Sequence, residues 1–184
     1  LIGIKVDTGA KALAGSNEEK ITEGLDGLRE RLKEYYKLGA RFTKWRGVYL
    51  ISEKYPSKLS ISVNAHALAR YAALVQESGM VPIIEPEVLM EGDHSAKDCF
   101  DKSSEVIRKC YDELELHNVD LKGTILKPNM ILPGKDSNEK VSKENDEFFS
   151  RNYNFKILPE GLNRYFNVEY IVRKSNTREH HKLN

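Results

Sequence analysis

Four pairs of polar residues recur at regular intervals between residues 5 and 129. The pairs are Lys5 with Asp7, Lys44 with Arg46, Glu85 with Glu87, and Lys127 with Asn129. One residue separates the members of each pair, so both side chains point to the same side of a β-strand. Successive pairs are roughly 40 residues apart, the length of one strand followed by one helix. The spacing predicts that the pairs line one face of a single sheet.

The residue types in these pairs suit the chemistry of an imine. A lysine that is desolvated among other cations has a lowered pKa, and its neutral amine can attack a ketone. Neighbouring glutamates can move the protons of this reaction, because crowding of like charges raises the pKa of one of them. The remaining lysines and the arginine could bind a phosphate. Taken singly, each residue is more often ion-paired or solvated than catalytic, and only the shared register favours a site.

Short apolar segments alternate with longer amphipathic ones, which predicts the elements that would position these pairs. We expect strands at 1–7, 41–51, 81–89 and 123–130, and helices near 21–38, 62–78 and 96–117. The order predicts a mostly parallel sheet with right-handed crossovers. We interpret two apolar helix stripes as packing surfaces: Leu25, Leu28 and Leu32 on the first helix, and Leu68, Tyr71, Ala72 and Val75 on the second.

Two architectures fit such a sheet, and the polar pairs favour one of them. A doubly wound sheet has helices on both faces, so each pair would be buried against apolar helices at a cost of several kcal/mol. In a closed β/α barrel one face lines the interior, and polar residues at the carboxyl ends of several strands converge on one site. We therefore predict an α/β fold of the TIM (β/α)8 barrel family, of which this chain supplies about four βα units.

Composition excludes several other classes of protein. The 184 residues include 29 lysines and arginines and 28 aspartates and glutamates, which gives a formal net charge of +1. A net charge this small does not favour binding to nucleic acid or to a membrane surface. No apolar run reaches the roughly 18 residues that a membrane span needs. The two cysteines, Cys99 and Cys110, are too few for a disulfide scaffold and favour a reducing compartment. We expect a cytoplasmic protein.

No metal or cofactor motif stands out in the sequence. It has no HExxH, no CxxC and no glycine-rich loop of the Walker or Rossmann type. We interpret His66 and His117 as surface or helix-capping residues rather than ligands, and His180 and His181 as part of a polar tail. The expectation is therefore no metal and no cofactor.

The motifs around the polar pairs resemble a known family. They are GIKVD at 3–7, LAG at 13–15, TEGLDGL at 22–28, KWR at 44–46, LARYA at 68–72, VPIIEPE at 81–87, EGDH at 91–94 and GTILKPNM at 123–130. Together they resemble class I (Schiff-base) fructose-1,6-bisphosphate aldolase, from residue 1 to Gly134. The resemblance implies a glycolytic lyase that reversibly cleaves fructose 1,6-bisphosphate to dihydroxyacetone phosphate and glyceraldehyde 3-phosphate. It also implies a sugar-phosphate partner, no metal, and a homotetramer for a full-length chain.

The resemblance implies a catalytic role for four residues. Lys127 would form the imine with the dihydroxyacetone phosphate skeleton, and Glu85 would act as acid and base around that step. Glu87 would orient and tune the lysine. Lys44 would support the polar network near the carbonyl and the cleaved bond.

The other four residues of the pairs would bind substrate or hold the site together. Lys5 and Arg46 resemble the family's group around the phosphate at the aldehyde end of the substrate. Asp7 and Asn129 would have structural, charge-pairing roles.

The resemblance stops before the end of the chain. We expect residues 1–134 to form an aldolase-like partial barrel and 135–184 a divergent, unassigned tail with strand-like stretches at 155–158 and 168–172. A complete barrel needs well over about 250 residues, and the first residue is not methionine, so the start is expected to be a cut. Two other functions stay open: an inactive fragment that associates with full-length aldolase subunits through exposed sheet edges, and a lyase of other sugar phosphates.

Overall fold

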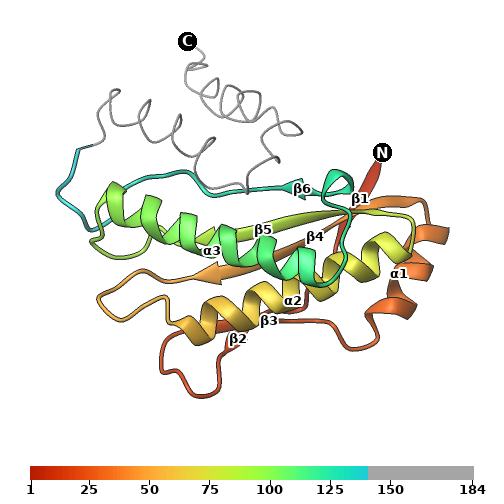
Figure 1. Ribbon diagram of the computed structural model, residues 1–184, viewed down its shortest axis with the longest axis horizontal. Helices are drawn as coiled ribbons and strands as arrows, with labels where there is room; N and C mark the ends of the chain where they lie inside the picture. Colours follow the sequence, from red (N-terminus) through yellow and green to blue (C-terminus); the bar gives the residue numbers. More distant parts are fainter. Residues whose placement is uncertain (141–184) are drawn as a thin grey trace, which may run out of the picture.

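The computed structural model describes residues 1–140 (Figure 1). Its elements are β1 (Ile2–Lys5), β2 (Gly9–Ala12), β3 (Lys20–Glu23), α1 (Leu28–Lys37), β4 (Ala40–Tyr49), α2 (Lys58–Glu77), β5 (Val81–Val88), α3 (Ala96–Leu116), the 3-10 helix η1 (Leu121–Gly123) and β6 (Ile125–Leu126). The main sheet has the order β1-β4-β5-β6, and all its neighbours are parallel. None of the described helices is long and apolar enough to cross a membrane.

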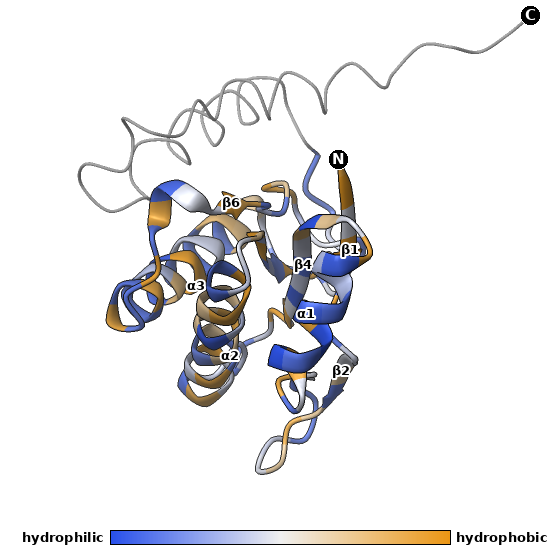
Figure 2. Ribbon diagram, turned by 90° about the vertical axis from the view of Figure 1, so that its right-hand side faces the viewer, coloured by the Kyte–Doolittle hydropathy of each residue, from blue (hydrophilic) through white to orange (hydrophobic). Residues whose placement is uncertain are grey.

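The helices lie on one face of this sheet, and the polar side chains of β4 and β5 lie on the other. α2 packs on β4 and β5, and α3 packs on α2 and β5, so the two helices lie side by side (Figure 2). On the helix side, Trp45 of β4 packs against Tyr71 of α2 with 5.4 Å between ring centroids. Lys44 and Arg46 alternate with Trp45 along β4 and therefore point to the other side. One covered face and one polar face, with strands added in chain order, are the arrangement of part of a β/α barrel.

The predicted packing stripe of the second helix is confirmed. Leu68, Tyr71, Ala72 and Val75 of α2 are all buried in the core between the helices and the sheet. For the first stripe, Leu28 and Leu32 of α1 are buried, whereas Leu25 packs against the core from the turn before the helix.

The expected helix near 21–38 is wrong in its first turns. Lys20–Glu23 instead form β3, which pairs antiparallel with β2, and α1 begins only at Leu28. Gly24 and Gly27 adopt φ values of 127° and 63°, which interrupt a right-handed helix. Thr22 is also held as a strand residue, because its hydroxyl donates to the carbonyl oxygen of Arg46 at 2.7 Å.

The expected strand at 123–130 is shorter than predicted. Paired strand covers only Ile125 and Leu126, with one more hydrogen bond from the amide of Lys127 to the carbonyl of Ile84 at 2.9 Å. Pro128 follows and has no N–H to donate, so the ladder ends there.

The segment after β6 lies against the loop between β5 and α3. The amides of Gly134 and Lys135 donate to the carbonyls of His94 and Met90, both at 2.8 Å. A Cβ at position 134 would stand 2.1 Å from the carbonyl oxygen of Gly92, so this close approach requires glycine. The division into 1–134 and 135–184 stays a prediction, and the strand-like stretches predicted at 155–158 and 168–172 lie outside the described residues.

Candidate active site

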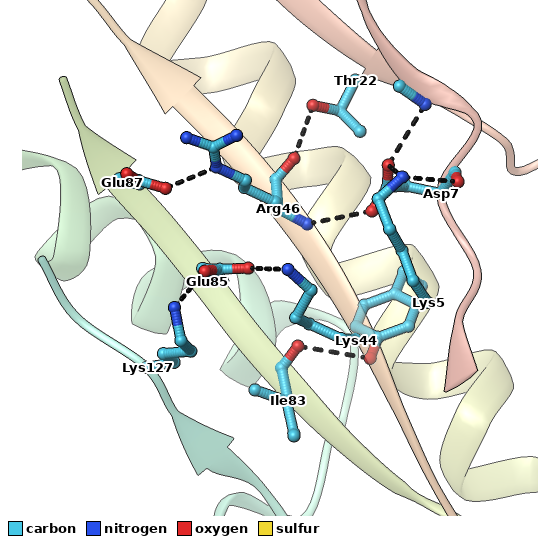
Figure 3. Close-up of polar contacts among 11 residues, drawn as sticks. Lys5, Asp7, Thr22, Lys44, Arg46, Ile83, Glu85, Glu87 and Lys127 are labelled. Carbon is cyan, nitrogen blue, oxygen red and sulfur yellow. Dashed lines mark hydrogen bonds and ion pairs between the residues drawn. The ribbon is translucent and has the colours of Figure 1, made fainter. Parts of the chain in front are cut away.

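Glu85 joins two lysines from neighbouring strands. It stands on β5 with 3% of its surface exposed. One carboxylate oxygen accepts a hydrogen bond from Nζ of Lys127, directly after β6, and the other lies 2.7 Å from Nζ of Lys44 on β4 (Figure 3). The structure therefore brings together three of the four residues to which the sequence assigns catalysis.

The electrostatics of Glu85 differ from the sequence-based expectation. Burial raises the pKa of Glu85, but the hydrogen bonds from Lys127 and Lys44 outweigh it, so the pKa lies below its ordinary value of 4.5. The expectation that crowding raises a glutamate pKa is therefore wrong for Glu85, because its close neighbours are cations. A carboxylate in contact with a lysine is placed to take a proton from the ammonium group.

Glu87 pairs with arginine rather than with a lysine. It follows Glu85 on the same face of β5, and its carboxylate accepts a hydrogen bond from Nε of Arg46 on β4. Two further hydrogen bonds hold the backbone of Arg46. Its carbonyl oxygen accepts from the hydroxyl of Thr22, and its amide donates to the carboxylate of Asp7. The sequence also predicts that Glu87 tunes Lys127. These contacts do not test that role, so it stays a prediction.

Asp7 fastens the end of β1 to β4. Its carboxylate lies 2.5 Å from Nζ of Lys5 and accepts from the amides of Gly9 at 3.1 Å and Arg46 at 3.3 Å. The Asp7 side chain is 2% exposed and that of Lys5 is 51% exposed. The exposed Lys5 side chain therefore pairs with the buried carboxylate of Asp7, next to Arg46 (Figure 3).

Asn129 does not share a face with Lys127, and the prediction is wrong on this point. Its side-chain oxygen accepts from the amide of Val88 at 3.2 Å, and its amide nitrogen donates to the hydroxyl of Ser103 on α3 at 3.1 Å. The alternation of a strand does not extend to residue 129, because β6 ends at Leu126. Asn129 therefore holds this segment to the helix layer and lies outside the lysine cluster.

Sequence reasoning missed Thr22, whose hydroxyl positions the main chain beneath the Arg46 side chain. The predicted helix at 21–38 includes Thr22, and helix periodicity does not indicate such a contact. Sequence reasoning also did not group His66, Glu113 and His117, which could together hold a metal ion. These three belong to α2 and the end of α3, in the helix layer.

Comparison with known proteins gives consistent results. The family model for fructose-bisphosphate aldolase class-I matches residues 1–150. A probable fructose-bisphosphate aldolase class 1 of Xanthomonas campestris is 56% identical over 142 residues, which cover 77% of this chain and 42% of that protein. The cytosolic fructose-bisphosphate aldolase 4 of Arabidopsis thaliana is 53% identical over 144 residues, covering 78% of this chain and 37% of that protein.

A solved structure agrees with these relatives. The fructose-bisphosphate aldolase from Plasmodium falciparum, in complex with TRAP and a small-molecule inhibitor, has a TM-score of 0.82 and 42% identity. It covers 85% of this chain, which corresponds to 46% of the Plasmodium chain. The likeness confirms the TIM-barrel fold class, and the chain spans about two fifths of the length of the two sequence relatives. The chain belongs to the class I fructose-bisphosphate aldolase family.

Proposed function

We propose that this chain carries the imine-forming part of a fructose-bisphosphate aldolase site. The whole site would reversibly cleave fructose 1,6-bisphosphate to dihydroxyacetone phosphate and glyceraldehyde 3-phosphate. The observation that carries the proposal is the contact of Lys127 with Glu85, whose second oxygen pairs with Lys44. Since the chain spans about two fifths of its sequence relatives, cleavage also depends on barrel strands beyond the four described here.

The arrangement supports a defined sequence of proton transfers. Glu85 takes a proton from the Lys127 ammonium, and the neutral amine adds to the ketone carbonyl to give a carbinolamine. Glu85 then returns a proton to the carbinolamine hydroxyl, which leaves as water and forms the iminium ion. The iminium accepts the electron pair released when the neighbouring carbon–carbon bond breaks, while the hydroxyl on the departing carbon gives its proton to a base from the rest of the barrel and becomes the aldehyde carbonyl. Lys44 stabilises the ionised form of Glu85 in the resting site.

The cations beside this cluster suit a phosphorylated substrate. The ion pair of Arg46 with Glu87 uses Nε, which leaves both Nη groups to bind a phosphate (Figure 3). The Arg46 side chain is 42% exposed and the Lys5 side chain 51% exposed, so a ligand can reach both. We assign Arg46 and Lys5 to phosphate binding, and Asp7 to holding Lys5 in place.

Borohydride trapping tests the proposal directly. The chain is incubated with dihydroxyacetone phosphate, the imine is reduced, and the adduct is located by intact mass and peptide mapping. We expect one reduced adduct, on Lys127, that is absent from Lys127→Arg and present in the surface control Lys135→Gln. A folded chain with unmodified Lys127 would contradict the proposal and favour the alternative of a non-catalytic fragment that associates with aldolase subunits.

We further propose a cytoplasmic location and a homo-oligomeric state in the full-length form. The first is supported by the free, buried thiols of Cys99 and Cys110 and by the cytosolic Arabidopsis relative. Fractionation with an antibody to the chain and size-exclusion chromatography test the two points.

A further inference from the structure

Two histidines and a glutamate meet on the helix layer, outside the candidate active site. His66 comes from α2, while Glu113 and His117 come from the last turn and the end of α3. Nδ1 of His66 lies 3.2 Å from Oε2 of Glu113, and Nδ1 of His117 lies 3.9 Å from the same oxygen. One ligand atom from each residue lies within 4.8 Å of the other two. The side-by-side packing of α2 and α3 creates this cluster (Figure 2).

Neighbouring groups hold the three side chains in place. His117 follows Glu113 by one helical turn, and its Nδ1 donates to the carbonyl oxygen of Glu113 at 2.8 Å. That bond places the proton on Nδ1 and leaves the lone pair on Nε2, as in many histidine ligands of metals. The rings of His66 and His117 contact each other edge to face, with 4.9 Å between their centroids.

The carboxylate between the rings is ionised and has one oxygen available. Lys109 pairs with Oε1 of Glu113 at 2.8 Å, which leaves Oε2 facing the histidines. The hydrogen bond from Lys109 lowers the pKa of Glu113, burial opposes it, and His66 adds to the lowering. The Glu113 side chain is only 9% exposed, so the anion is fixed between the helices rather than free in solvent.

We propose that His66, Glu113 and His117 form a binding site for a divalent transition-metal ion of the Zn²⁺ class. Two imidazole nitrogens and one carboxylate oxygen are a donor set that zinc accepts, with water in the remaining position. Tetrahedral coordination at bond lengths of about 2.1 Å requires ligand atoms about 3.4 Å apart. The 3.2 Å between Nδ1 of His66 and Oε2 of Glu113 is already close to that spacing, and one ligand atom of each of the three residues lies within 4.8 Å of the other two.

The site would fasten one helix to the other. A metal bound by His66 from one helix and by two residues from the next occupies the native state only, so it stabilises the fold. This role is independent of the imine chemistry, because none of the three residues belongs to the lysine cluster.

Metal titration of the full chain tests this site, once the tail histidines are removed as competing ligands. In an H180Q/H181Q background we expect one equivalent of Zn²⁺ to bind, measured by competition with a chromophoric chelator. Co²⁺ should give visible absorption bands of a low-coordinate site. Far-UV circular dichroism confirms that each variant is folded.

Single substitutions then locate the ion. His66→Gln and Glu113→Gln should each weaken Zn²⁺ binding at least tenfold, and Zn²⁺ should no longer raise their Tm. Glu115→Gln, an exposed carboxylate on the same helix, is the matched control and should bind as the background does. Failure of the background chain to bind at roughly 100 μM Zn²⁺, or unchanged binding by folded His66→Gln, would overturn the proposal.

Discussion

The most direct test of the lysine cluster is Glu85→Gln. The substitution keeps the shape of the side chain and its ability to accept a hydrogen bond, but glutamine cannot take up or release the proton. Loss of a positioned acid–base group typically slows a reaction by about 10²–10⁴-fold. Each factor of ten corresponds to about 1.4 kcal/mol of activation free energy.

Glu85→Gln also removes the ion pair between Glu85 and Lys127. The Lys127 side chain is 58% exposed. For such a pair the lost attraction is at most about 1 kcal/mol, which corresponds to less than a tenfold change in rate. The lost proton transfer is the larger effect, and we expect a net loss of at least about tenfold.

The assay is the initial rate of borohydride-trapped adduct on Lys127, followed by mass spectrometry at saturating dihydroxyacetone phosphate. Glu87→Gln is the matched comparison, because it removes a carboxylate that contacts Arg46 instead of a lysine. We expect Glu87→Gln to trap within about tenfold of the unaltered chain. If folded Glu85→Gln traps as fast as the unaltered chain, Glu85 is not the acid–base group and the reasoning fails.

Three further predictions concern stability. The pKa of Glu85 is lower in the fold than its ordinary value of 4.5, so its stabilising effect is present above that pH and is lost as the pH falls below it; urea midpoints between pH 3 and 7 should show this, with a flatter profile for Glu85→Gln. Leu68→Ala should lower the free energy of unfolding by about 2–5 kcal/mol, and Leu59→Ala, 46% exposed on the same helix, by much less in the same denaturation assay. Gly134→Ala should speed hydrogen exchange at the Lys135 amide, because its Cβ collides with Gly92; unchanged exchange would show that the segment accommodates a side chain.

The sequence was most informative where a strict alternation of polar and apolar residues met a full strand. Lys44 and Arg46 on β4 face Glu85 and Glu87 on β5 because both strands are regular for their whole length and pair in parallel register. Alternation carried no such information at Asn129, where β6 had already ended. The predicted orientation of the Asn129 side chain is wrong because paired strand ends at Leu126. The presence of Pro128 in the sequence does not by itself show where the strand ends.

Two other features depended on tertiary contacts that no local pattern encodes. The stretch around Thr22 has a helix-compatible apolar period, but its hydroxyl and amide bond to Arg46 and Asn64 from distant parts of the chain. The approach of His66 to Glu113 depends on how α2 packs against α3. Helix periodicity predicts which face is buried, and it does not fix the axial offset between two helices.

The order of strands in the main sheet has a consequence for how this region acquires its structure. Each crossover places its strand beside the one before it, from β1 to β4, β5 and β6. Forming each new strand pair therefore closes a loop of only one crossover, and the entropy lost per step stays small and nearly constant. The three residues around Glu85 come from consecutive strands of this series, β4, β5 and the end of β6. Their contacts can thus form as soon as the third of these strands docks, before any more distant part of a barrel closes.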